Sequence, residues 1–143
     1  MTTKTHLIFT VVSSLVVVGA IVCGVFVVGS PAAARKQRFD QQRLSNLQTI
    51  FREVQSLCHD PDIKDELKRT LPATLDELKS QARTERISLT DPETGERYSY
   101  SVKNATTYEL CATFTLKRDS DTDVYWNHPA GKHCFTVNAL DPP

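Results

Sequence analysis

"AAARKQRFDQQRLSNLQTIFREVQSLC", residues 32–58, contains neither proline nor glycine and repeats apolar residues at intervals of three and four. This spacing predicts a long helix with one apolar face that a second layer must cover. The apolar stripe consists of Leu44, Leu47, Ile50, Phe51, Val54, Leu57 and Cys58. We expect the opposite, polar face to be solvated. It carries Arg43, Gln48, Arg52, Glu53 and Gln55.

Short breaking motifs bound this helix on both sides. In "GSP", residues 29–31, Ser30 suits an N-cap and Pro31 the first helical position, so a preceding helix should be interrupted here. After the helix, Pro61 disfavours helical geometry at the residue before it. A short helix through Ile63 and Leu67 and another in "TLDEL", residues 74–78, are expected to follow. In the latter, Thr74 and Glu77 have capping-box spacing.

An uncharged run, residues 7–29, precedes the long helix. Twenty-three helical residues span about 34 Å, enough for a hydrocarbon core of roughly 30 Å. The leading interpretation is therefore a transmembrane helix whose partner is the lipid bilayer. The alternative is a cleaved signal peptide, because Ala32, Ala33 and Ala34 offer an A-x-A cleavage site. We divide the chain into an anchor with its junction, residues 1–34, and a domain, residues 35–143.

The domain carries almost balanced charge. It has 109 residues with sixteen basic and seventeen acidic side chains, because only Lys4 among the charged residues lies in the anchor. A net charge of −1 gives no electrostatic reason to bind nucleic acid.

Two features of the sequence predict opposite orientations of the domain relative to the membrane. Lys4 lies on one side of the apolar run, and Arg35, Lys36, Arg38 and Arg43 lie on the other, so the positive-inside rule favours a cytoplasmic domain. The cysteines favour an extracytoplasmic domain, because disulfides persist in oxidising compartments.

The second half of the chain has turn and strand patterns. In "DPETGERYSYSV", residues 91–102, a proline and glycine turn leads into the alternating Tyr98, Tyr100 and Val102. "NATT", residues 104–107, forms a loop, and "YELCATFTL", residues 108–116, and "HCFTV", residues 133–137, alternate likewise. These patterns predict an α+β fold in which the long helix packs on about three antiparallel strands. The expected core contacts join Leu47, Ile50, Phe51 and Val54 to Tyr98, Tyr100, Leu110, Phe114 and Phe135.

The four cysteines have separate expected roles. Cys111 and Cys134 share the more polar side of their strands, and a disulfide between them would contribute roughly 3 to 4 kcal/mol. The alternative is two free thiols in a cytoplasmic domain. Cys58 is expected as a small buried residue and Cys23 as an inert one in the apolar run.

Catalytic and metal motifs are weak in this sequence. His128, His133 and Cys134 lie close together, but only the histidine pair has a zinc-ligand spacing, and no C-x-x-C is present. Asp119, Asp121 and Asp123 begin like a calcium loop, yet Val124 and Ala130 stand where an EF-hand needs glycine and glutamate. We therefore predict no enzyme activity, cofactor or metal, and a catalytic or metal-binding group of His128, His133 and Cys134 is the less favoured alternative. Trp126 is expected in the core rather than as an exposed contact residue.

The order of these segments resembles that of the pilins and pseudopilins, most nearly the major pseudopilin of type II secretion. A membrane helix continues into an amphipathic helix, and "LPATLDEL", residues 71–78, and "DPETGERYSYSV" then lead to the strands. The "DPETG", "YELCATF" and "HCF" segments also resemble those of a set of bacterial membrane-anchored proteins without an assigned activity. The resemblance implies a pilin-like fold and a structural or interaction role, with protein partners in a secretion or surface assembly.

The chain departs from the pilin pattern at its start. Residues 1–30 contain no glutamate and no prepilin peptidase site, features by which that family is processed and its subunits registered. Filament assembly is therefore not expected. The sequence predicts a single-pass, membrane-anchored, non-enzymatic protein with an extracytoplasmic domain, and the alternative is a cytoplasmic-facing, membrane-tethered interaction module.

Overall fold

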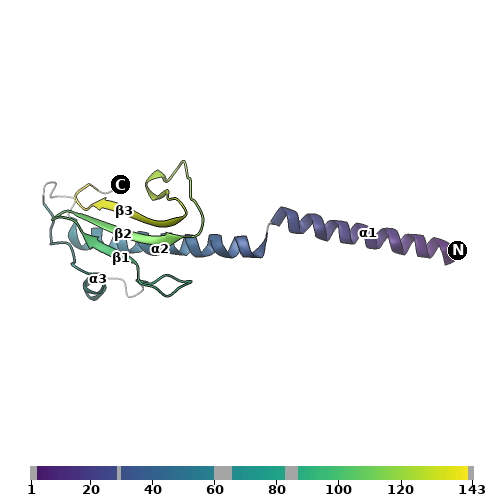
Figure 1. Cartoon of the computed structure of the whole chain (residues 1–143), viewed down its shortest axis with the longest axis horizontal. Coiled ribbons are helices and arrows are strands. Elements are labelled where there is room, and N and C mark those ends of the chain that lie inside the picture. The colour runs from purple at the N-terminus through teal and green to yellow at the C-terminus, as the bar shows by residue number, and fades with distance from the viewer. Residues whose placement is uncertain (1–2, 29, 60–65, 83–86, 142–143) are drawn as a thin grey trace. The chain divides into compact units, whose positions relative to one another are not determined.

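The computed structural model describes residues 3–28, 30–59, 66–82 and 87–141. The chain forms two compact units, Met1–Arg35 and Lys36–Pro143. Along the chain the elements are α1 (Thr3–Val28), α2 (Pro31–Cys58), α3 (Leu75–Gln81), β1 (Ser99–Val102), β2 (Thr107–Phe114), the 3-10 turn η1 (Val124–Trp126) and β3 (Gly131–Asn138) (Figure 1). The fold is α+β, as predicted.

The helix α1 is apolar on every side. Between His6 and Gly24 it is long and apolar enough to cross a membrane, and its side chains there are exposed. Two of its hydroxyl groups bond within the helix, since Thr10 donates to the His6 carbonyl at 2.8 Å and Ser13 donates to the Phe9 carbonyl. Such back-bonding is what a hydroxyl needs where water is excluded.

The helix α2 begins as the sequence predicted. Ser30 is the N-cap, and its hydroxyl accepts a hydrogen bond from the Ala33 N–H at 3.2 Å. Pro31 is the first helical residue, a position whose N–H would have no acceptor within the helix, so its absence costs nothing. Within the domain, one face of α2 contacts the sheet, and Leu47, Ile50 and Val54 are fully buried there.

The sheet has three antiparallel strands in the order β1-β2-β3. Tyr100 pairs with Leu110 in the first ladder, and Leu110 pairs with Phe135 in the second, so one row of side chains crosses all three strands. Figure 1 shows α2 running behind this sheet. Between them lies a single apolar core, which also takes in Leu71, Leu75 and Leu78 around α3 and Ile87 and Leu89 before the turn.

The short helix α3 has the predicted cap. Thr74 accepts the Glu77 N–H at 3.2 Å, and the Glu77 carboxylate accepts the Ala73 N–H at 2.7 Å. The Thr74 bond is the predicted N-cap contact, whereas Glu77 binds the N–H of the residue before Thr74 and not that of Thr74 itself. Leu75 and Leu78 are buried and anchor the helix on the core.

Two apolar residues assigned to the covered face of the sheet are exposed. Val102 ends β1, and Leu116 lies two residues beyond β2, and each is 40% exposed. The strand β2 is shorter than its alternating sequence pattern, so Leu116 lies beyond the sheet, whereas Val102 is the last residue of the edge strand β1. Of the short helix expected through Ile63 and Leu67, residues 60–65 lie outside the described residues, and Leu67 is not helical but packs partly buried against the core.

Candidate functional site

The solvated position predicted for Arg43 is wrong. Its side chain is 3% exposed and lies between α2, the turn before β1 and the end of β2. The reason is visible in the spacing along α2, because Asp40, Arg43 and Leu47 continue the buried face toward the start of the helix. Polar residues thus take over the face where the apolar stripe ends. Glu53 is also buried rather than solvated, because the covering layers reach around more of α2 than the apolar stripe.

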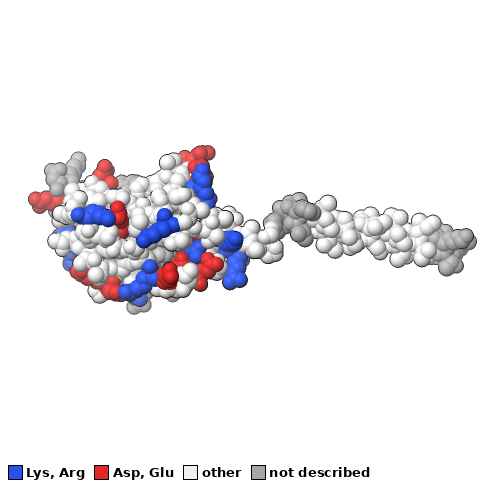
Figure 2. All heavy atoms as spheres, in the orientation of Figure 1, with Lys and Arg blue, Asp and Glu red and all other residues white. Residues whose placement is uncertain are grey.

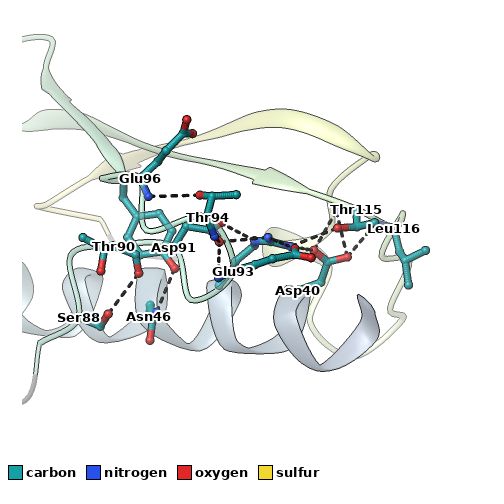
Figure 3. Close-up of polar contacts among 12 residues, drawn as sticks. Asp40, Asn46, Ser88, Thr90, Asp91, Glu93, Thr94, Glu96, Thr115 and Leu116 are labelled. Atoms are coloured by element: carbon teal, nitrogen blue, oxygen red, sulfur yellow. Dashed lines mark hydrogen bonds and ion pairs between the residues drawn. The ribbon is translucent and has the colours of Figure 1, made fainter. Parts of the chain in front are cut away.

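Every N–H donor of the Arg43 guanidinium has an acceptor. Nε and Nη2 donate to the two carboxylate oxygens of Asp91 at 2.5 and 3.1 Å. Nη2 also donates to Glu93 at 2.6 Å, and Nη1 donates to Asp40 at 2.7 Å and to the Thr115 hydroxyl at 3.2 Å. Since arginine carries five such donors in a rigid plane, this geometry uses all of them. We call Asp40, Arg43, Asp91 and Glu93 the ionic cluster (Figure 3).

Asp91 is held by the turn in which it lies. Its carboxylate accepts the N–H groups of Glu93 at 2.8 Å and Thr94 at 3.0 Å, and its carbonyl accepts the Gly95 N–H at 2.9 Å. Gly95 has φ = 74°, a conformation that favours glycine. The sequence motif "DPETG" therefore forms a turn that presents a buried carboxylate to α2.

The contacts of Asp91 and Arg43 favour the charged form of each side chain. Burial by itself would raise the pKa of Asp91, but the hydrogen bonds from Arg43 and from the Thr94 and Glu93 backbones outweigh it and lower that pKa. The hydrogen bond to Asp91 is in turn the main cause that raises the pKa of Arg43. The pair is therefore ionised across the physiological pH range.

Asp40 joins α2 to the end of β2. Its carboxylate accepts the Thr115 N–H at 2.8 Å and the Leu116 N–H at 2.7 Å, in addition to the Arg43 bond. These are the two backbone donors that follow the last residue of β2. Figure 3 shows Asp40 facing Thr115 and Leu116, with the turn residues Asp91 and Glu93 approaching from the other side.

A polar chain continues from the ionic cluster along α2. Gln42 donates to the Asn46 side-chain oxygen at 3.0 Å, and Asn46 donates to the Tyr98 hydroxyl at 2.9 Å. Tyr98 is the residue before β1, and burial raises the pKa of its hydroxyl. Asn46 thus links α2 to the residue that precedes the sheet.

An open cavity of about 570 Å³ adjoins the cluster. Its lining combines the turn, with Glu93 and Arg97, and exposed positions of the sheet, with Thr113 and Lys132. Both signs of charge are present, and Arg97 already pairs with Asp76. The cavity therefore has no net electrostatic preference for one class of ligand.

Cys111 and Cys134 form a disulfide between β2 and β3. They are direct partners in the ladder, as the shared parity of their strands indicated. Their sulfurs lie near a carboxylate oxygen of Glu109, but disulfide sulfurs are not thiolates and do not ligate a metal at this position. Because Cys134 is in the disulfide, its sulfur is not a free thiolate. It therefore cannot serve as a metal ligand or nucleophile in the alternative group with His128 and His133.

His128 is buried against an aromatic ring. Its ring stacks on Phe114 with centroids 3.5 Å apart, and Nδ1 lies 3.1 Å from the Pro129 carbonyl oxygen. Burial is the main cause that lowers its pKa. His133 lies edge-on to Phe135 instead. Both histidines therefore act as members of the aromatic packing around Phe135.

The residues chosen from the sequence as core contacts lie together around α2 and the sheet. Phe51 and Tyr100 are partly buried and pack against the core, and Trp126 is buried in it beside Phe51. The remainder are buried: Leu47, Ile50, Val54, Tyr98, Leu110, Phe114 and Phe135. The ionic cluster was not foreseen. The continued spacing of Asp40, Arg43 and Leu47 is the feature that could have identified it.

In comparisons with known proteins, no family model, curated protein or solved structure matches this chain.

We expect the domain to lose stability in acid through Asp91. Its pKa is lowered in the folded state, so its contribution is fully present above its unfolded pKa of about 3.9 and disappears as the pH falls through the folded value. Urea unfolding followed by fluorescence of Trp126, the single tryptophan, should give midpoints that fall below about pH 4. The Asp91→Asn variant should be less stable at pH 7 and should depend less on pH in this range. If the unfolding midpoint depends equally on pH in both proteins, the loss of stability in acid does not come from Asp91.

Proposed function

We propose that this chain is a single-pass, membrane-anchored, non-enzymatic protein whose pilin-like domain lies outside the cytoplasmic membrane and serves a structural or interaction role. The observation that carries the proposal is the pairing of an exposed apolar helix, α1, with a domain whose sheet contains a disulfide. The helix needs a lipid environment or removal, and the disulfide needs an oxidising compartment.

The pilin-like character is supported by the order of the elements. An apolar helix is followed by a long helix that contacts a small antiparallel sheet, as the resemblance implied. A tethered domain of this kind would meet protein partners in a secretion or surface assembly. No cofactor or nucleic acid is part of the proposal.

A non-enzymatic role is supported by the way the reactive groups are occupied. All five guanidinium donors of Arg43 have acceptors, Cys134 is oxidised, and His128 is stacked on Phe114. Groups already engaged in the folded structure are poorly placed to act on a substrate.

One observation favours a second candidate, a cytoplasmic-facing interaction module tethered to the membrane. Arg35, Lys36 and Arg38 follow the apolar helix, whereas Lys4 alone precedes it. Basic residues are enriched on the cytoplasmic side of membrane spans. The charge distribution and the disulfide thus support opposite orientations, and an experiment on sidedness separates them.

The test is protease protection combined with thiol labelling in cells that express the intact chain. We expect the protein to stay in the membrane pellet after an alkaline wash and the domain to be digested when protease is added outside the cytoplasmic membrane. Cys111 and Cys134 should be labelled only after reduction. Cys58 provides the internal control, because it is a buried free thiol that should react only after denaturation.

The outcomes distinguish the candidates. A domain digested only after the cytoplasmic membrane is opened, with Cys111 labelled without reductant, would replace the proposal with the cytoplasmic module. A mature chain that begins near Ala34 and is released from the membrane would identify α1 as a signal peptide and overturn the anchor.

A further inference from the structure

One end of the folded domain brings basic side chains together with an exposed leucine. Lys36 and Arg38 come from the first turns of α2, and Leu116 and Lys117 follow β2, and all four are exposed. We call these four residues the basic surface. Figure 2 shows basic side chains at the end of the domain where α2 begins.

Asp40 is what brings these two distant segments together. Its carboxylate accepts the Leu116 N–H at 2.7 Å, across 76 residues of sequence, and it lies two positions beyond Arg38 in the same helix. Because Asp40 is only 7% exposed and also bonds to Arg43, the segment after β2 is fixed at this position. Leu116 and Lys117 are therefore held beside the start of α2.

Three acidic residues that adjoin this surface have basic partners. Asp40 and Glu93 are bonded to Arg43, and Asp119 is paired with Lys117 at 2.7 Å. In the Lys117 pair both side chains are about 70% exposed, so the pair contributes little and is readily exchanged for another anion. Residues 1–39 contain no acidic residue. Among the exposed side chains named here, the basic Lys36, Arg38 and Lys117 outnumber the acidic Glu93 and Asp119 by three to two.

Two of the basic residues follow the apolar helix closely in sequence, since Lys36 and Arg38 come eight and ten residues after Val28. The rise of α2 places Arg38 about 10 Å along the helix from Pro31. In the proposed membrane protein, Lys36 and Arg38 therefore lie within reach of the lipid headgroups. Lysine and arginine near an anionic membrane surface each contribute about 1 kcal/mol to binding.

We propose that the basic surface contacts anionic phospholipid headgroups, with Leu116 at the boundary of the acyl chains, and holds the domain against the bilayer. This inference rests on the proposed membrane anchor. The side chain of Leu116 supplies apolar contact of the kind seen in interfacial segments, and the three basic side chains supply the charge. The partner is the lipid surface itself.

The experiment uses the intact chain reconstituted in vesicles with lipids that carry a fluorescence quencher just below the headgroups. Leu116→Trp reports on the proposed contact, and Val102→Trp is the matched control, because both residues are 40% exposed and Val102 lies at the opposite end of the sheet. Wild-type protein gives the background of the buried Trp126. Vesicles of pure phosphatidylcholine are compared with an equal mixture of phosphatidylcholine and phosphatidylglycerol.

We expect Leu116→Trp to be quenched strongly in the anionic vesicles and weakly in the neutral ones, while Val102→Trp is unaffected in both. Adding Lys36→Gln, Arg38→Gln and Lys117→Gln should shift the docking equilibrium by about 100-fold and abolish the difference. High salt should act in the same direction. Equal quenching at both reporter positions, or in both lipids, would overturn the inference.

The same samples separate failure of the inference from failure of the anchor. If the chain leaves the vesicles in an alkaline wash, the membrane anchor is wrong. If the chain remains and Leu116→Trp shows no dependence on anionic lipid, the anchor is retained and the basic surface is not a lipid contact.

Discussion

Arg43→Met should lower the free energy of unfolding of the domain by about 3 to 5 kcal/mol, the range for a buried ion pair that loses one partner. Asp40 and Asp91, 7% and 8% exposed, would then be left without their counterion in the interior. For a domain of this size the loss corresponds to a fall in Tm of roughly 15 to 30 °C. Thermal unfolding followed by Trp126 fluorescence measures it, because that ring lies in the core.

The matched control for this variant is Arg97→Met. Arg97 forms a bidentate pair with Asp76, but the two side chains are 60% and 63% exposed, so its loss should change the stability far less than the loss of Arg43. Arg43→Lys should fall between wild type and Arg43→Met, because lysine keeps the charge without the planar set of donors. If the two methionine variants unfold at the same temperature, the ionic cluster does not hold the turn to α2.

The second large effect is expected from the disulfide. Cys111 and Cys134 close a loop with a sequence separation of 23, for which the chain-entropy model gives about 3 to 4 kcal/mol. The double variant Cys111→Ala and Cys134→Ala should therefore unfold at a lower denaturant concentration than oxidised wild type.

Reductant provides the control for the disulfide prediction. It should bring wild type close to the double variant and leave the double variant unchanged. If reductant has no effect on the wild-type midpoint, either the bond does not form in the protein or it contributes nothing to stability, and labelling of Cys111 distinguishes these two cases.

The architecture could be predicted because it depends on periodic patterns. The stripe of Leu47, Ile50 and Val54 on α2 and the alternation around Leu110 and Phe135 each place side chains on one face without knowledge of tertiary contacts. Strand parity likewise placed Cys111 and Cys134 on one side of the sheet. Local geometry and hydrophobic burial decide all of these features.

The ionic cluster could not be predicted in the same way. A charged residue on a helix is usually solvated, and the partners of Arg43 lie 48, 50 and 72 residues away in sequence, at Asp91, Glu93 and Thr115. Only the tertiary fold brings them together. The exposed position of Leu116 could not be predicted for a related reason. The sequence alternation continues from Phe114 to Leu116, but β2 ends at Phe114, and the Leu116 N–H bonds to Asp40 instead of to a neighbouring strand.

The position of the ionic cluster along α2 has a mechanical consequence. Asp40 is the first buried residue of that helix, and Leu44 is its first buried apolar residue. A pulling force that enters the domain through the N-terminal end of α2 would load the bonds from Asp40 and Arg43 to the turn and to β2 before it reached the apolar core. Short, directional bonds would thus resist the first displacement, and the core would resist only after they had yielded.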